Sequence, residues 1–63
     1  MDYGYVMVKG YYIKGKMEGF WTRFDENGTL RETENYLKGN KNGTFKYFNK
    51  NGNLIEEKSF YID

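Results

Sequence analysis

The apolar positions of this chain fall into short segments, separated by polar clusters rich in glycine and asparagine. Three of these segments, residues 5–13, 29–37 and 53–61, place apolar or aromatic side chains at even spacings. Two shorter aromatic segments, 19–25 and 43–49, lie between them. Because successive side chains of a β-strand point to opposite faces, even spacing is typical of strands, and the pattern predicts five of them.

The pattern returns after about 24 residues. The aligned pairs are Tyr12 and Tyr36, Gly19 and Gly43, Trp21 and Phe45, Phe24 and Phe48, Gly28 and Gly52, Leu30 and Leu54, and Tyr36 and Phe60. A fixed period of this length is typical of tandem-repeat proteins. We therefore expect one domain, residues 1–63, in which a half-repeat at 4–14 precedes repeats at 15–38 and 39–62.

Asparagine–glycine pairs mark the predicted hairpin turns. Asn27-Gly28 and its copy Asn51-Gly52 accept the positive φ angles of a two-residue type I′ turn, and the residues before them allow a slightly longer loop instead. The glycine-bounded segments 15–19 and 39–43 are expected to form the longer connections. The predicted fold is all-β, a single antiparallel meander sheet of about five strands made of tandem hairpin repeats.

The repeat-matched apolar residues form the predicted core, because within the three longer segments they share parity and therefore one face. Trp21 and Phe24 differ in parity. Either a β-bulge lies between them or one of them serves the other face, and we favour the bulge. The other aromatic residues then lie on a second face, which nothing in the chain is predicted to cover.

Composition removes several kinds of chemistry. The chain has no cysteine and no histidine, which excludes disulfides, thiolate or imidazole metal sites and histidine-based catalysis. We expect no cofactor and no enzymatic activity. A domain of 63 residues without a disulfide or a metal is near the lower size limit for folding alone, so we expect a homodimer or docking on a partner.

Two weaker patterns indicate other functions. Lysine alternates with aromatic residues in Lys46-Tyr47-Phe48, as in proteins that stack on single-stranded nucleic acid, but a net charge of +1 argues against this partner. Glu32 and Glu34 share a strand face, like the carboxylate pair of a glycosidase. So small a sheet offers no deep pocket, and we expect these carboxylates to be solvated and paired across strands.

The start of the chain lacks the cationic residues and long apolar stretch of a signal peptide. No segment approaches the roughly 18 apolar residues that a transmembrane helix requires. We therefore expect no membrane binding. The expected location is the cytoplasm of a bacterial cell, or of the host cell in the case of a phage product.

One arrangement of residues extends over nearly the whole chain, from 4 to 62. Its first copy comprises Gly15-Lys16-Met17-Glu18-Gly19-Phe20-Trp21, Phe24, Asn27-Gly28, Leu30 and Tyr36, and its second copy runs from Gly39 to Phe60. This arrangement resembles the MORN repeat variant family. The resemblance implies an elongated sheet of stacked hairpins that is often antitoxin-like and mediates protein contacts or, in related repeats, membrane association. It supplies no catalytic motif.

Repetition leaves some aromatic residues unexplained, and these are the candidate protein-binding residues of the second face: Tyr5, Tyr11, Phe20, Tyr47 and Tyr61. Tyrosine is enriched at interfaces, although strand propensity alone would also account for these residues. We predict a non-catalytic protein-binding module that acts stoichiometrically, such as an antitoxin or a small inhibitor, including a phage product that blocks a host defence protein. The alternatives are a structural self-assembling repeat and a binder of small ligands or lipid surfaces.

Overall fold

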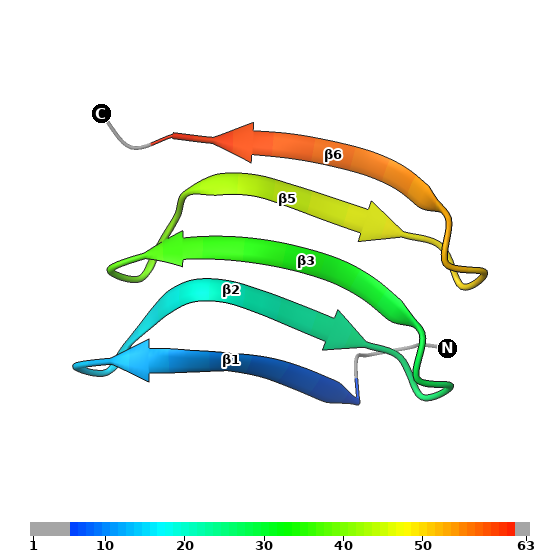
Figure 1. Ribbon diagram of the computed structural model, residues 1–63, viewed down its shortest axis with the longest axis horizontal. Helices are drawn as coiled ribbons and strands as arrows, with labels where there is room; N and C mark the ends of the chain where they lie inside the picture. Colours follow the sequence, from blue (N-terminus) through cyan, green and yellow to red (C-terminus); the bar gives the residue numbers. More distant parts are fainter. Residues whose placement is uncertain (1–5, 62–63) are drawn as a thin grey trace.

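The computed structural model describes residues 6–61 and shows one open antiparallel sheet (Figure 1). Its strands are β1 (Met7–Ile13), β2 (Lys16–Phe24), β3 (Leu30–Leu37), β4 (Asn40–Lys41), β5 (Gly43–Phe48) and β6 (Leu54–Phe60). The spatial order is β1-β2-β3-β5-β6, and the short β4 pairs with β3. The predicted all-β meander is therefore confirmed. No helix in the described part of the chain has the length and apolar character for crossing a membrane.

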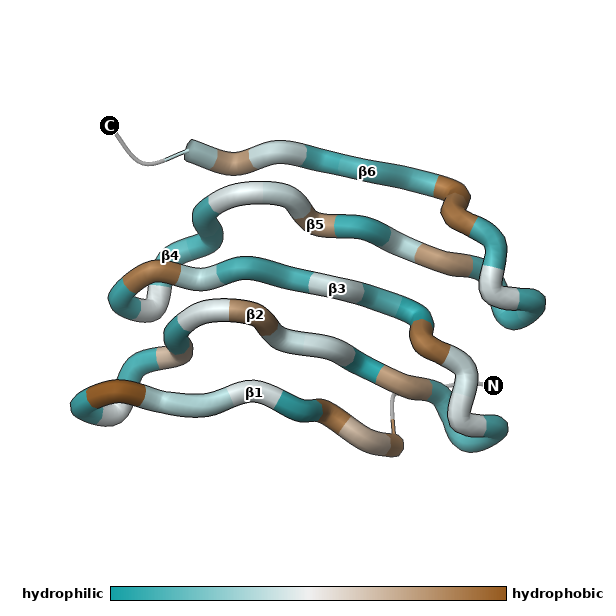
Figure 2. The backbone as a smooth tube through the Cα atoms, viewed as in Figure 1, coloured by the Kyte–Doolittle hydropathy of each residue, from teal (hydrophilic) through white to brown (hydrophobic). Residues whose placement is uncertain are grey.

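The sheet is a single curved layer, and its dimensions are 34 × 22 × 16 Å. The most hydrophobic positions lie toward the strand ends, whereas the middle of β3 and of β6 is hydrophilic (Figure 2). Trp21 and Phe45 are the buried apolar side chains of the described residues. Several repeat-matched positions, including Val6 and Leu54, are exposed, because residues 6–61 form one layer and leave the ends of the strands uncovered.

The turns correct the sequence prediction. The two-residue turns lie at Lys14-Gly15 and Lys38-Gly39, whose φ angles of 52° and 80°, and 51° and 86°, are all positive, as a type I′ turn requires. We had expected these positions to belong to the longer connections. Lysine is an uncommon residue for a left-handed backbone, so the composition of the turn gave a weak signal.

The asparagine–glycine pairs form the longer loops instead. In residues 25–29, only Gly28 has a positive φ, the N–H of Gly28 donates to the carbonyl of Asp25, and the N–H of Asp25 donates to the carbonyl of Thr29. The second loop repeats these bonds between Gly52, Asn49 and Asn53. The alternative of a slightly longer loop is therefore the one that forms.

A β-bulge occurs beside Phe24 and again beside Phe48, but the extra residue belongs to the neighbouring strand. Arg31 is left without an opposite residue on β2, and Ile55 without one on β5. β2 keeps its alternation here, and the ammonium of Lys9 lies 5.5 Å from the Phe24 ring centre. Phe24 therefore lies on the face opposite Trp21, in contrast to the single apolar face that we expected.

The strand pairing defines two faces. The ring face carries Tyr12, Trp21, Tyr36, Phe45 and Phe60, which contact one another in that order. The second face carries the cross-strand row Lys9, Thr22, Thr33, Lys46 and Glu57. Residues directly opposite each other in paired strands share a face, so each further side chain can be assigned by its partner.

Candidate functional site

One aromatic ring from each long strand forms a continuous row across the ring face. Its ring centres are separated by 5.1, 6.3, 5.5 and 5.0 Å, and every neighbouring pair meets edge to face. Such pairs contribute about 0.5–1.5 kcal/mol each beyond simple burial. The ammonium of Lys41 lies over the Phe45 and Phe60 rings at 5.4 and 5.0 Å. This row is the core of the sheet, and its function is structural.

Gly10 and Gly19 have no side chain, and the space that this leaves is filled by two aromatic side chains, Trp21 and Tyr11. Three residues of β2, 19–21, oppose the single residue Gly10 of β1, and the indole of Trp21 lies against Gly10. The indole N–H donates to the carbonyl of Glu18 at 3.1 Å. The hydroxyl of Tyr11, on β1, lies 2.5 Å from the position that a Cβ on Gly19 of β2 would occupy. Any larger residue at either glycine would displace an aromatic side chain.

A buried carboxylate lies within the ring face. Glu34 is only 3% exposed, Arg23 Nε donates to its Oε2 at 2.7 Å, and the Tyr36 hydroxyl donates to its Oε1 at 3.0 Å. Burial raises the pKa of Glu34, but hydrogen bonds with Glu32, Arg23 and Tyr36 outweigh it, so the pKa is lowered overall. The pKa of Arg23 is raised because its guanidinium is hydrogen-bonded to Glu34.

This network corrects one half of the expectation for these carboxylates and confirms the other. Glu34 is buried instead of solvated, whereas its pairing with Arg23 across neighbouring strands is as expected. Glu34 is buried, and its lowered pKa keeps it ionised at neutral pH. An ionised carboxylate paired with arginine accepts hydrogen bonds and does not supply the proton that a glycosidase acid must donate. The network therefore stabilises the sheet by giving a buried charge its partners.

The candidate functional surface is an apolar patch on the second face, at the end of the sheet that carries the two-residue turns. It is formed by Tyr11 and Ile13 of β1, Phe20 of β2 and Leu37 of β3, which we call the second-face patch. Tyr11, Ile13 and Phe20 are 52%, 51% and 57% exposed. Polar residues lie directly opposite them on the neighbouring strands: Glu18, Lys16 and Asn35. Exposed large apolar side chains bordered by polar ones are typical of a binding surface.

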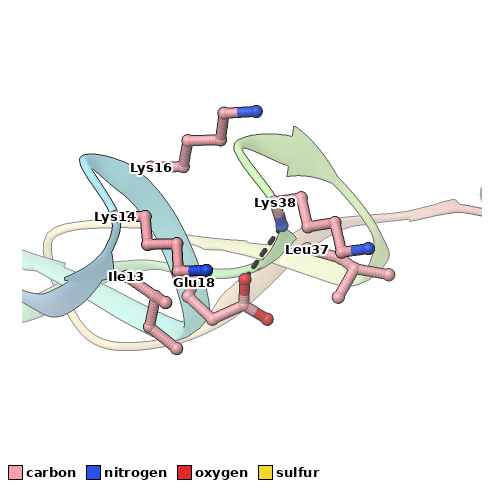
Figure 3. A pocket seen from close by; sticks show the side chains of 6 residues that line it. All are labelled: Ile13, Lys14, Lys16, Glu18, Leu37 and Lys38. Carbon is pink, nitrogen blue, oxygen red and sulfur yellow. Dashed lines mark hydrogen bonds between the residues drawn. The ribbon is translucent and has the colours of Figure 1, made fainter.

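A groove of about 420 Å³ adjoins this patch (Figure 3). It is lined by Ile13, Lys14, Lys16, Glu18, Leu37 and Lys38. Figure 3 shows the Glu18 carboxylate next to the turn at Lys38, and the backbone N–H of Lys38 donates to Glu18 Oε1 at 2.9 Å. Three lysines and one glutamate give the groove a positive rim around an apolar floor.

The structure brings together two of the predicted binding residues. Tyr11 and Phe20 lie on the second face, as expected. Tyr47 does not, because it lies opposite Glu32 and Glu56 on the ring face; burial first, and the charge of Glu32 second, raise the pKa of its hydroxyl. Tyr61 follows β6 and is 77% exposed. Tyr5 falls outside the described residues.

Our choice of site residues missed the lysines of the groove. The two Lys-Gly turns recur with the 24-residue period, and this recurrence was the signal that could have located Lys14 and Lys38. Residues 6–61 include no grouping of acidic side chains suited to holding a metal ion.

Comparison with known proteins gives the family. The family model described as MORN repeat variant matches the chain twice, at residues 17–38 and 41–63. No curated protein and no solved structure matches it significantly. The first match covers the β2–β3 hairpin, and the second covers β5 and β6. Since the two matches together span more than half of the sequence, this protein belongs to the MORN repeat variant family.

Proposed function

We propose that this protein is a non-catalytic binding module that docks on another protein through the second-face patch and acts stoichiometrically. The observation that carries the proposal is the exposure of Tyr11 and Phe20, which are 52% and 57% accessible on adjacent strands of the single sheet that the described residues form. Aromatic side chains of this kind supply much of the binding energy at protein interfaces.

The charges around the patch describe the partner. Lys14, Lys16 and Lys38 surround the apolar floor of the groove, and Glu18 is engaged by the backbone of Lys38. A partner that inserts an apolar side chain flanked by carboxylates would satisfy both parts of this surface. An antitoxin or a small inhibitor in the bacterial cytoplasm, including a phage product directed at a host defence protein, is the use that fits such a small binder.

Affinity purification from the source cells tests this proposal. The tagged chain should recover one protein in a fixed ratio, and Phe20→Ser should abolish that recovery, because it removes the most exposed ring of the patch. Ile55→Ser is the matched control: Ile55 is 63% exposed but lies on β6, away from the patch. Recovery of no partner, or equal loss with both variants, would refute the proposal.

The lysines of the groove favour one alternative, binding to an anionic lipid surface. Vesicle flotation separates the two functions. If the chain floats with phosphatidylserine vesicles but not with phosphatidylcholine vesicles, and the triple variant K14Q/K16Q/K38Q stays at the bottom, the lipid surface replaces the protein partner. We expect no flotation, because the same face also carries Glu18 and Glu57 and the net charge is only +1.

A further inference from the structure

We propose that two copies of this chain associate through β1, edge to edge and antiparallel, about a two-fold axis perpendicular to the sheet. The two sheets then become one continuous sheet. This inference goes beyond the binding of another protein, because it pairs the open backbone edge of β1. Tyr11 and Ile13 lie at this edge as well as in the second-face patch, whereas Phe20 and Leu37 stay outside the interface. It also gives a specific interface to the homodimer that the sequence predicts.

The edge of β1 is open and apolar. Among the strands of residues 6–61, β1 has a neighbour on one side only, and all seven of its residues are exposed. Its apolar side chains include Met7, Val8 and Ile13, which are 49%, 43% and 51% exposed, and Lys9 is its single charged residue. An unpaired strand of this composition readily pairs with another chain.

The other edge carries the charges that oppose such pairing. The middle of β6 reads Glu56-Glu57-Lys58, and all three residues are exposed. If two copies of β6 paired about its central residue, Glu57 would face Glu57. Two Glu56–Lys58 pairs would lie beside it, but Lys58 already contacts Glu56 of its own chain at 3.5 Å. Charged side chains in an edge strand discourage its pairing with another chain, and Lys9 is the one charged residue of β1.

The direction of the strands decides between a closed pair and an open array. Five strands follow one another along the sheet, and each is antiparallel to the next, so β1 and β6 run in the same direction (Figure 1). Addition of a copy by simple translation would therefore create a parallel pair between β6 and β1. A two-fold axis beside β1 creates an antiparallel pair and leaves no further apolar edge, so growth stops at two copies.

The register follows from the length of β1. Full overlap of residues 7–13 centres the axis on Gly10 and places Lys9 opposite Tyr11 of the second copy. Val8 then lies opposite Tyr12, and Met7 opposite Ile13. Lys9 and Tyr11 belong to the second face, whereas Tyr12 contacts Trp21 on the ring face. No like charges are opposed, and the faces of the two copies coincide.

Tyr12 shows what the pairing would complete. It is the terminal ring of the aromatic row and remains 63% exposed, and among residues 6–61 its ring neighbour is Trp21. In the proposed dimer, Val8 of the second copy covers the free side of Tyr12. The row thus gains apolar cover at the end where the single chain leaves it open.

Sedimentation of the purified chain over a range of concentrations tests the proposal. The wild type should pass from the mass of one chain to the mass of two and no further. In the dimer, residue 11 of each copy faces Lys9 of the other copy. Tyr11→Lys therefore creates two pairs of like charges, and Tyr11→Glu creates two pairs of opposite charges. The dimer dissociation constant of Tyr11→Lys should therefore exceed that of Tyr11→Glu by roughly tenfold at low salt, and the ratio should shrink as salt rises.

Phe20→Lys and Phe20→Glu carry the same changes of net charge on β2, outside the interface, and should dimerise equally. In the wild type, a half-labelled sample should show intermolecular nuclear Overhauser contacts between Lys9 of one copy and Tyr11 of the other. A wild type that stays monomeric, a mass that grows beyond two chains, equal Tyr11 variants or an equal charge effect at Phe20 would each overturn the proposal. None of these outcomes bears on the binding of a protein partner by the second-face patch.

Discussion

The indole ring of Trp21 lies so close to Gly10 that a Cβ on Gly10 would fall 2.0 Å from the indole Cδ2. Gly10→Ala should therefore push the ring out of the aromatic row and destabilise the fold by about 1–3 kcal/mol, as measured by urea unfolding. Trp21 is the single tryptophan, so its fluorescence should change in the folded variant as well.

Gly52→Ala is the control for this substitution. Its Cβ would meet nothing within 4 Å, and only the backbone strain at a φ of +86° opposes it. That strain costs about 1 kcal/mol and should leave the Trp21 fluorescence unchanged. Equal fluorescence in both variants would contradict the close packing at Gly10.

Glu34→Gln should destabilise the folded chain by about 2–3 kcal/mol at neutral pH, because it replaces the buried carboxylate that Arg23 and Tyr36 donate to by a neutral amide. Glu57→Gln, at an exposed position on β6, should stay within about 0.5 kcal/mol of the wild type. Chemical unfolding at pH 7 measures both. A cost for Glu34→Gln no larger than that for Glu57→Gln would show that the buried ion pair contributes nothing.

The lowered pKa of Glu34 also sets the direction of the pH dependence. Its folded pKa lies below the ordinary value of 4.5, so its stabilising contribution is present above that value and is lost as the pH falls through the folded pKa. The urea midpoint should therefore decrease on acidification below about pH 4.5. In Glu34→Gln this decrease should be smaller, and Asp25, whose pKa is also lowered by the Thr29 and Asn27 backbone N–H groups, should account for part of what remains.

Each of the two longer loops is held by a side-chain oxygen at the same position of the repeat. Asp25 Oδ1 accepts hydrogen bonds from the backbone N–H groups of Asn27 and Thr29, and Asn49 Oδ1 accepts from those of Asn51 and Asn53. Asn49→Ala should destabilise the fold by about 1 kcal/mol, whereas Asn49→Asp should keep both bonds and most of the stability. Thermal unfolding of the two variants gives the comparison, and equal losses would exclude this capping role.

The Lys-Gly turns offer a stabilising substitution. Lys38 adopts a φ of 51°, a left-handed conformation that asparagine accepts more readily than lysine. Lys38→Asn should raise the stability by about 0.5 kcal/mol, while the backbone bond from residue 38 to Glu18 is retained. Lys50→Asn, in a loop where lysine has no positive φ, should have no such effect in the same melting experiment.

The arrangement of strands was predictable because local patterns determine it. The repeat of about 24 residues and the even spacing of its apolar positions gave the meander and the family. The prediction placed the two-residue turns where the longer loops lie, and the reverse. Asparagine–glycine is the stronger signal for a short hairpin turn, but Asp25 and Asn49 stabilise a longer loop around it.

Two features of the site depend on positions that pattern alone does not give. Glu34 looked like a solvated charge, because its partner Arg23 comes eleven residues earlier and meets it only through the pairing of β2 with β3. Tyr47 was expected on the second face because a bulge was expected to put both Phe45 and Phe48 in the core. Without that bulge in β5, alternation from Phe45 and the register against Glu32 place Tyr47 on the ring face. Tyr11 and Phe20 were placed correctly because strand alternation is enough at their positions.

The row of rings allows the number of repeats in this protein to change during evolution. Within the row, each ring meets the ring before it and the ring after it, so no central residue has to be rebuilt when a hairpin is added or removed. A duplication of the gene segment for one repeat would produce a longer protein that already carries its own turns and its own rings. Surfaces of different reach are therefore available to this family through copying alone, before any single residue is altered.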